Sequence, residues 1–256
     1  MDAVTPVLEA QHLGVTFGGV HALSGVDVGF ARGQICGVIG PNGAGKTTLF
    51  DCLTGVTAPS AGRILFDGTD VTQRSATWRA RHGVRRTFQR QQTFGWLPVE
   101  DNVLVALEWH GGGGGLLADL IAWPSRRAQE RARRERVREA LSLCGIEHLA
   151  REPAGNLPVG RARLVELARA VADHPRVLLL DEPTSGMEES EVENLGAVVQ
   201  RLRAEEGCAV ILVEHDVGFV MEQCDRVVVL DLGTLIADGV PDDVRQDARV
   251  RAAYLG

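Results

Sequence analysis

The chain is short of several features that mark other classes of protein. Its 256 residues contain a single tyrosine and five cysteines, which are scattered and nowhere spaced as Cys-x-x-Cys. This pattern argues against a disulfide framework and indicates reduced thiols that fill apolar space in a cytoplasmic protein. No run approaches about 18 consecutive apolar residues, so no membrane-spanning helix is expected. The N-terminal residues lack the basic and apolar segments of a signal peptide, so none is expected.

Basic residues are outnumbered by acidic ones, 27 against 34. The formal net charge is −7, and an acidic protein does not offer the positive surface that nucleic acid needs in a main partner. The apolar fraction of 45% is ordinary for a globular protein, and the length suits one large domain or two small ones. Among 27 basic residues, Lys46 is the only lysine. A planar guanidinium does not easily replace a compact ammonium at a phosphate site, so Lys46 is the first candidate for such a site.

Apolar strand patterns alternate with helical patterns along most of the chain. Apolar or alternating runs predict strands at residues 7–13, 15–17, 26–30, 35–39, 63–66, 83–87, 177–180, 209–213, 227–230 and 235–237. Helical periodicity predicts helices at 46–54, 99–108, 126–143, 161–172, 189–204 and 217–223. Strands that are apolar throughout indicate a parallel sheet covered on both faces, and therefore an α/β fold. Residues 92–172 show no clear strand pattern, which predicts a helical insertion.

Two segments of this insertion admit alternative interpretations. Residues 111–115 are five consecutive glycines, which are more typical of a flexible loop than of a ligand site. Residues 125–141 carry seven arginines and three glutamates. They predict a solvated helix with glutamate–arginine pairs, and the alternative is a basic face near anionic lipid headgroups.

A glycine-rich segment follows the predicted strand at 35–39. Residues 40–47 fit the pattern Gly-x-x-x-x-Gly-Lys-[Ser/Thr] and lead into a predicted helix. Backbone N–H groups of such a loop surround phosphate oxygens, and the helix N-terminus adds partial positive charge. Lys46 would reach the β- and γ-phosphates of ATP, and the Thr47 hydroxyl would bind Mg²⁺. The predicted nucleotide-binding residues are Gly40, Pro41, Asn42, Gly43, Ala44, Gly45, Lys46, Thr47 and Thr48.

Two more strand ends carry side chains suited to the same site. The strand at 177–180 leads into Asp181 and Glu182, and the strand at 209–213 precedes His215. Asp181 is predicted to join the Mg²⁺ shell, and Glu182 to orient or deprotonate the water that attacks the γ-phosphate. His215 would hydrogen-bond the γ-phosphate. Because ligands bind at the carboxyl ends of parallel strands, these residues are expected at one ATP site.

These motifs resemble those of the ATP-binding cassette (ABC) ATPases, and the resemblance covers nearly the whole chain. It implies a RecA-like P-loop NTPase core with an N-terminal antiparallel β subdomain, at about residues 1–91 and 173–256. A helical subdomain is implied at about residues 92–172. The resemblance also implies that Gln89 is a catalytic residue and Mg²⁺ ligand, that Phe17 stacks on adenine, and that Glu182 and His215 are the catalytic glutamate and the switch histidine.

Cassettes of this family work as head-to-tail dimers, and the segment that this chain would lend to its partner departs from the family pattern. The signature, usually LSGGQ, reads Leu-Pro-Val-Gly-Arg at residues 157–161, before the helix. Pro158 offers neither a hydroxyl nor an N–H, whereas Gly160 and the helix N-terminus can still contact the partner's ATP. The next element ends in Glu188 where the family has aspartate. The resemblance therefore implies a second cassette as partner, and a heterodimer is favoured over a homodimer.

Within the family, the chain most resembles the cassettes of branched-chain amino-acid importers. The shared segments are Phe-Gly-Gly-Val-His-Ala-Leu at 17–23, Arg-Thr-Phe-Gln at 86–89 and the ending Tyr-Leu-Gly. The resemblance implies membrane permease subunits as partners, indirect work with a periplasmic or extracellular solute-binding protein, and a peripheral position at the cytoplasmic face of the plasma membrane. ATP and Mg²⁺ are the implied cofactors, and no nucleic acid is expected as a partner.

Three other functions stay open at this point. A lipopolysaccharide-export cassette shares the Tyr-Leu-Gly ending but tends to lack the segment at 109–127. An ABC ATPase of translation or DNA repair usually has two cassettes or a long coiled coil, and neither is present here. A regulatory module that holds ATP without useful hydrolysis would account for the unusual signature.

A surface for the permease is expected at residues 91–99. Phe94, Trp96 and Leu97 lie close together in this segment. The alternative is that these side chains pack within the helical subdomain.

Overall fold

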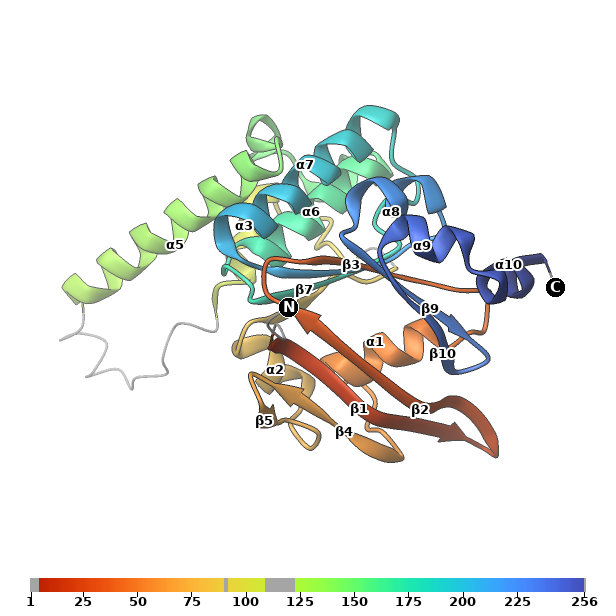
Figure 1. Cartoon of the computed structure of the whole chain (residues 1–256). Helices are drawn as coiled ribbons and strands as arrows, with labels where there is room; N and C mark the ends of the chain where they lie inside the picture. Colours follow the sequence, from red (N-terminus) through yellow and green to blue (C-terminus); the bar gives the residue numbers. More distant parts are fainter. Residues whose placement is uncertain (1–4, 90–91, 109–122, 256) are drawn as a thin grey trace. The chain divides into compact units, whose positions relative to one another are not determined.

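The computed structural model describes residues 5–89, 92–108 and 123–255, which form two compact units (Figure 1). Unit 1 takes its residues from the N-terminal part up to 89, from 175–184 and from 199–256. Unit 2 takes its residues from 90–174 and 185–198. The five-glycine run at 111–115 lies outside the described residues.

Unit 1 contains both β-sheets. Its strands are β1 (Pro6–Phe17), β2 (Val20–Ala31), β3 (Ile35–Ile39), β4 (Ala61–Phe66), β5 (Thr69–Asp70), β6 (Val84–Arg86), β7 (Val177–Asp181), β8 (Ala209–Val213), β9 (Arg226–Asp231) and β10 (Thr234–Gly239). Its helices are α1 (Lys46–Thr54), α2 (Ala76–Arg81), α8 (Val217–Gln223), α9 (Pro241–Gln246) and α10 (Ala248–Leu255). The helix α7 (Glu189–Glu206) begins in unit 2 and ends in unit 1.

The smaller sheet is antiparallel, with strand order β2-β1-β4-β5. The sequence predicts two strands at 7–13 and 15–17, whereas the structure has one strand, β1, with an irregular register near its middle. His12 has a φ of +48° there, and its N–H donates a 2.8 Å hydrogen bond to Asp27. Gly62 lies opposite on β4, where a Cβ would collide with the carbonyl oxygens of Gln11 and His12. This bulge interrupts the apolar alternation and explains why the pattern reads as two strands.

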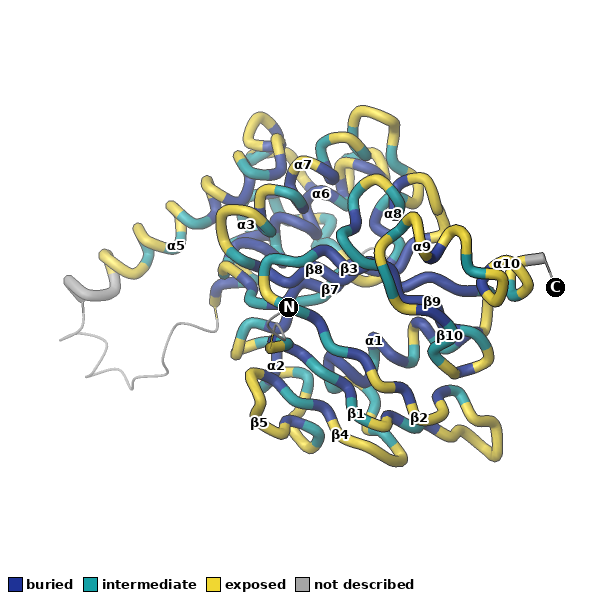
Figure 2. Tube along the Cα trace, viewed as in Figure 1, coloured by how far each residue is buried: buried dark blue, intermediate teal, exposed yellow. Residues whose placement is uncertain are grey.

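The larger sheet has six strands in the order β10-β9-β3-β8-β7-β6. All its neighbouring pairs are parallel except β10 with β9. Every residue of β3, β7 and β8 is buried, which Figure 2 shows as continuous dark blue trace. Strands of this kind need cover on both faces, so the predicted parallel α/β sheet is confirmed. The carboxyl ends of β3, β8, β7 and β6 consequently lie side by side along one edge.

The predicted buried, reduced cysteines are also confirmed. All five are described, buried and free. Burial raises the pKa of Cys36 to about 12, so its thiol stays protonated at neutral pH.

A buried arginine closes the C-terminal end of α1. Arg79, on α2, is 1% exposed, and its guanidinium donates to main-chain carbonyl groups. The acceptors are the carbonyl oxygens of Cys52, Leu53, Val71, Thr72 and Arg74. Since the last carbonyl groups of a helix have no partner within it, Arg79 satisfies the end of the helix that begins at the glycine-rich loop.

Replacing Arg79 with alanine is expected to lower the free energy of unfolding by roughly 3–5 kcal/mol, because several buried carbonyl groups lose their donor. Urea denaturation of the purified protein measures this change. Arg81→Ala is the matched control, because Arg81 is an exposed arginine of the same helix, and it is expected to change stability by about 0.5 kcal/mol or less. Equal effects of the two substitutions would contradict the structural role of Arg79.

Unit 2 is helical. It contains α3 (Val99–Val105), α5 (Trp123–Leu143), α6 (Val159–Val171) and the first half of α7, with short 3₁₀ turns at Glu147–Leu149 and Ala154–Asn156. Asn102 of α3 is fully buried and organises the preceding segment. Its side chain exchanges hydrogen bonds with the backbone of Phe94 and donates to the carbonyl groups of Leu97 and Pro98. No helix among the described residues is long and apolar enough to cross a membrane.

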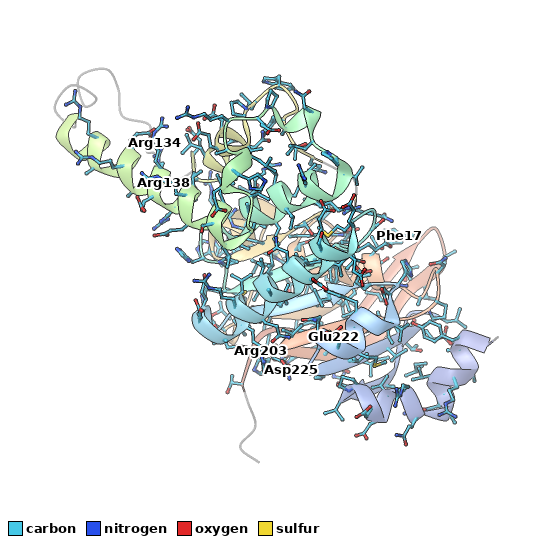
Figure 3. The ribbon with its side chains drawn as sticks, turned by 90° about the horizontal axis from the view of Figure 1, so that it is seen from above. Phe17, Arg134, Arg138, Arg203, Glu222 and Asp225 are labelled. Atoms are coloured by element: carbon cyan, nitrogen blue, oxygen red, sulfur yellow. The ribbon has the colours of Figure 1, made fainter. Side chains whose placement is uncertain are left out.

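The arginine-rich helix α5 is largely exposed before Val137. Arg134 pairs with Glu130 at 2.9 Å, and Arg138 pairs with Glu135 at 2.7 Å. Figure 3 labels the two arginines on this helix. The prediction of a solvated helix with glutamate–arginine pairs is therefore confirmed.

Candidate functional site

The polar residues predicted for the ATP site follow four adjacent strands of the parallel sheet. The glycine-rich loop follows β3, His215 follows β8, Asp181 ends β7, and Gln89 lies shortly after β6. In such a sheet the carboxyl ends of the strands meet at one edge, where ligands bind. All these residues belong to unit 1.

Lys46 is held by the glycine-rich loop itself. Its ammonium donates hydrogen bonds to the carbonyl oxygens of Gly40 at 2.6 Å and Pro41 at 2.9 Å. Burial lowers the pKa of Lys46 below its ordinary value, and the negative charges of Glu182 and Asp181 oppose that shift. The ammonium is thus placed inside the loop, with both carboxylates close enough to influence its charge.

A cavity of about 200 Å³ opens at this loop. Its lining comprises Ala22, Asn42, Gly43, Ala44, Gly45, Lys46, Thr47, Thr48, Glu182, Val213 and His215. Helix α1 begins at this cavity, and its N-cap residue, Gly45, provides no side-chain hydrogen bond to the first turn. The uncapped N–H groups and the buried ammonium fit a phosphate group, because both stabilise negative charge.

Glu182 lies between the other two predicted catalytic side chains. Gln89 Nε2 donates to Glu182 Oε2 at 2.9 Å, and His215 Nε2 is 2.8 Å from Glu182 Oε1. A carboxylate only accepts hydrogen bonds, so the imidazole donates here. The structure thus brings Gln89, Glu182 and His215 together.

The backbone at Glu182 is unusual. Its φ is +48°, a left-handed conformation that costs a residue with a side chain about 1–2 kcal/mol. The Glu182 N–H donates to the Val213 carbonyl at 2.8 Å and ties the end of β7 to the end of β8. This strained turn directs the carboxylate into the cavity wall beside His215.

Asp181 forms a buried ion pair. Its side chain is 6% exposed, and its Oδ2 accepts a 2.7 Å hydrogen bond from Arg86. Hard oxygen ligands suit Mg²⁺. The Thr47 hydroxyl lies in the cavity lining, whereas Asp181 and Gln89 are not among the lining residues. The Asp181 carboxylate is close enough to the Lys46 ammonium to act on its pKa, and the Gln89 side chain contacts Glu182, which lines the cavity. The oxygen donors of Thr47, Asp181 and Gln89 therefore fit a magnesium ion beside the phosphate cavity.

Phe17 does not line this cavity. It is the last residue of β1 and is 53% exposed (labelled in Figure 3). Ala22, on β2, is the residue of this hairpin that reaches the cavity, and its carbonyl oxygen lies against Gly45, which has a φ of +101°. A side chain at position 45 would meet that oxygen, so glycine is required there.

The segment predicted as the signature lies in unit 2, and its helix begins earlier than the sequence indicates. Helix α6 starts at Val159 with Pro158 at the N-cap, so the predicted start at residue 161 or 162 is wrong. Proline suits this place because it has no N–H to leave unpaired at the helix start. Gly160 is buried in the first turn, and a Cβ there would collide with the carboxylate of Glu191. A carboxylate of the same chain therefore already lies at this helix N-terminus.

Sequence reasoning missed several residues that support the site. Glu214 is 4% exposed and accepts hydrogen bonds from the Thr184 N–H and hydroxyl, both at 2.7 Å, and from the His215 N–H at 3.1 Å. It joins the segments that follow Glu182 and β8. The Tyr254 hydroxyl accepts a hydrogen bond from the Gly40 backbone, which opposes the rise that burial causes in the pKa of Tyr254. The position of Glu214 next to His215 in the sequence could have indicated the contacts of Glu214. No local sequence pattern indicated the contact between Tyr254 and Gly40.

Comparison with known proteins agrees with this geometry. The family model described as ABC transporter matches residues 23–185, and the model described as branched-chain amino acid ATP-binding cassette transporter matches residues 234–256. The chain is 39% identical, over 98% of both chains, to BraF of Pseudomonas aeruginosa, a high-affinity branched-chain amino acid transport ATP-binding protein.

Two further comparisons give lower identities. The lipopolysaccharide export system ATP-binding protein LptB of Escherichia coli K12 is 33% identical over 97% of both chains. Among solved structures, a nucleotide-free ATP-binding cassette of an ABC transporter has a TM-score of 0.84 at 28% identity, covering 98% of this chain and 99% of the other. The fold is therefore that of a P-loop ATP-binding cassette. The chain belongs to the ABC transporter family and is an ATP-binding cassette of the kind whose ATPase activity is coupled to transport.

Proposed function

We propose that this chain is one of two non-identical cassettes that power the import of branched-chain or related amino acids. The observation that carries this substrate class is the match of residues 234–256 to a family of branched-chain amino acid cassettes, because this segment lies outside the general ABC match at 23–185. The name of BraF supports the same class. LptB, at lower identity, supports the alternative of lipopolysaccharide export.

The cavity at the glycine-rich loop is the proposed ATP site. The proposed phosphate contacts come from the loop residues 40–45 and from Lys46, Thr47 and Thr48, because they surround an uncapped helix N-terminus. Phe17 is the proposed adenine contact, and its exposed ring is accessible for stacking. Thr47, Asp181 and Gln89 are the proposed ligands of Mg²⁺, which when bound would neutralise charge on the phosphate oxygens.

Glu182 is the proposed general base. Its carboxylate can take a proton from the water that attacks the γ-phosphate, because it lies in the wall of the phosphate cavity. Gln89 and His215 orient that carboxylate, each through one of its oxygens. His215 also lines the cavity, so it is placed to contact the γ-phosphate itself.

The signature segment supports the proposal of an asymmetric pair of cassettes. Pro158 has no hydroxyl and no N–H for a phosphate, and the Glu191 carboxylate at Gly160 adds negative charge at the same helix end. Both features weaken phosphate binding at this place. The stronger ATP site would therefore combine this chain's Lys46, Asp181 and Glu182 with the signature of a different cassette.

Isolated wild-type chain is expected to hydrolyse ATP slowly, since a homodimer would use the weak signature at both sites. Pro158→Ser is expected to raise this rate by roughly tenfold, because the added hydroxyl and N–H can bind a charged phosphate. Steady-state phosphate release measures the rate. Pro158→Ala is the matched control that restores the N–H without the hydroxyl. A fast wild-type rate that Pro158→Ser leaves unchanged would contradict the asymmetric pair.

The proposed contact with the permease subunits is the segment at residues 91–99, of which residue 91 lies outside the described residues. Trp96 is 79% exposed, whereas Phe94 packs edge-on against it at 5.9 Å and lies under the Arg169 guanidinium. The two interpretations of this segment therefore apply to different residues: Phe94 packs within unit 2, and Trp96 offers an apolar surface to a partner. With such a contact the chain would lie at the cytoplasmic face of the plasma membrane as a peripheral subunit.

Uptake of radiolabelled leucine by cells that lack the gene tests the proposed substrate class. Uptake is expected to fall, to recover when the wild-type chain is supplied, and to stay low with Glu182→Gln. The solute-binding protein outside the membrane would be required as well. Normal uptake together with a loss of lipopolysaccharide from the cell surface would contradict import and support the export function.

A further inference from the structure

Arg86 connects two carboxylates beside the candidate site, and neither the motifs nor the proposed function assigns it a role. It is the last residue of β6 and pairs with β7 in parallel register. Its Nη2 donates to Asp181 Oδ2 at 2.7 Å, and its Nη1 lies 2.5 Å from Asp51 Oδ1. Asp51 belongs to α1, so one guanidinium joins the strand end at Asp181 to the helix of the phosphate loop.

The guanidinium lies in a dry environment. The Arg86 and Asp181 side chains are each 6% exposed, and Asp51 is 28% exposed. The rings of Phe50 and Phe88 lie 5.5 and 5.1 Å from the guanidinium carbon. The buried Arg86 Nε has no hydrogen-bond partner. The position of the group is therefore set by two carboxylates and two aromatic rings.

The two carboxylates depend on this one cation. Planar guanidinium groups hold carboxylates with fixed geometry, which a compact ammonium does not reproduce. Without Arg86, two neighbouring carboxylates would lose their common positive partner in a site of low water content. Buried charges left without a partner are strongly unfavourable, so the Asp181 side chain would leave its present orientation.

The hydrogen bond of Arg86 uses only one oxygen of Asp181. Among the described residues, no hydrogen bond to the other oxygen, Oδ1, accompanies it. We propose that Arg86 is a positioning residue for the magnesium site, and that it holds Asp181 through Oδ2 so that Oδ1 faces the metal ion. This inference rests on the proposed role of Asp181 as a Mg²⁺ ligand.

The proposal assigns Arg86 an effect on metal binding that a general structural role would not produce. Arg86→Gln keeps a hydrogen-bond donor but removes the charge and the two-point contact. The gain in nucleotide affinity that Mg²⁺ produces is then expected to fall by about tenfold, because a charge-assisted contact to the metal ligand is lost. Affinity for the nucleotide without Mg²⁺ is expected to change less than about twofold, because the loop and Lys46 are untouched.

Isothermal titration calorimetry with a non-hydrolysable ATP analogue tests this expectation on the full chain, once with Mg²⁺ and once with excess chelator. Arg85→Gln is the matched control, since Arg85 precedes Arg86 on the same strand, and it should leave both affinities unchanged. Thermal unfolding without nucleotide reports whether each variant folds. If Arg86→Gln does not fold, Arg86→Lys replaces it, and a partial loss of the Mg²⁺ gain is expected.

Each outcome separates the inference from its alternatives. A parallel fall of both affinities would assign Arg86 a purely structural role and overturn the proposal. A larger gain from Mg²⁺ would mean that Arg86 competes with the metal, which also overturns it. Asp181→Asn tests the underlying assignment of Asp181 as a metal ligand. If this substitution leaves the Mg²⁺ gain intact, Asp181 is not a metal ligand. If the gain is lost in Asp181→Asn but intact in Arg86→Gln, only the positioning role of Arg86 is wrong.

Discussion

Replacing Glu182 with glutamine is expected to lower the rate of ATP hydrolysis by about 10²–10⁴-fold. The amide cannot accept the proton of the attacking water, but it is nearly the same size as the carboxylate. Its single amide oxygen can keep the contact with His215, and its NH₂ group can keep the contact with Gln89 if the Gln89 amide turns to accept; both residues now bind Glu182, at 2.8 and 2.9 Å. Phosphate release under saturating ATP, with the partner cassette present, measures the loss.

ATP binding should survive this substitution, which separates a chemical role from a binding role. Equilibrium binding of ATP to Glu182→Gln is therefore expected within a few-fold of the wild-type value. Glu222→Gln is a suitable control, because Glu222 is an exposed glutamate of α8 in the same unit (Figure 3). An unchanged rate in Glu182→Gln would remove Glu182 from the role of general base.

Replacing Lys46 with alanine is expected to weaken nucleotide binding itself, by about 10–100-fold. The ammonium is buried among loop carbonyl groups next to the cavity, and a phosphate would lose its compact positive partner. Fluorescence titration with a labelled ATP analogue measures the affinity.

Lys46→Arg sharpens this test because it keeps the charge and changes its shape. The guanidinium is too broad to take the place where one ammonium contacts both Gly40 and Pro41, so reduced affinity is expected here too. Such a result would explain why a chain with 26 arginines keeps one lysine. Normal affinity in Lys46→Ala would count against the phosphate-loop assignment.

Much of the fold was accessible from the sequence because its central strands are buried on both faces. Strands β3 and β8 and helices α1 and α8 were predicted with the bounds that the structure has. The elements that were missed, β5, α2, α9 and α10, are short or carry little periodic apolar pattern. Their formation depends on tertiary contacts, such as those of the buried Arg79, which local pattern does not show.

The residues of the candidate site likewise fall into those that the sequence predicts and those that it does not. The spacing around Lys46 and the acidic end of β7 could be read directly, because these residues are determined by local chain geometry and by the end of a buried strand. Arg86 could not be found in that way, because arginine is the common basic residue of this chain and its partners lie 35 and 95 positions away. The positive φ of Glu182 was equally hidden, since the backbone contact that accompanies it is with Val213, 31 positions away at the end of β8.

Association with a membrane transporter as one of two different cassettes is the central claim, and co-purification tests it most directly. Tagged Glu182→Gln chain would be purified from gently solubilised native membranes with Mg-ATP, and the co-purifying proteins identified by mass spectrometry. We expect polytopic permease subunits together with a second cassette. We expect the tagged Lys46→Ala chain to recover none of these proteins in a higher yield than the Glu182→Gln chain does. Permeases without a second cassette would contradict the asymmetric pair, and only ribosomal or nucleic-acid-binding proteins would contradict the transporter function.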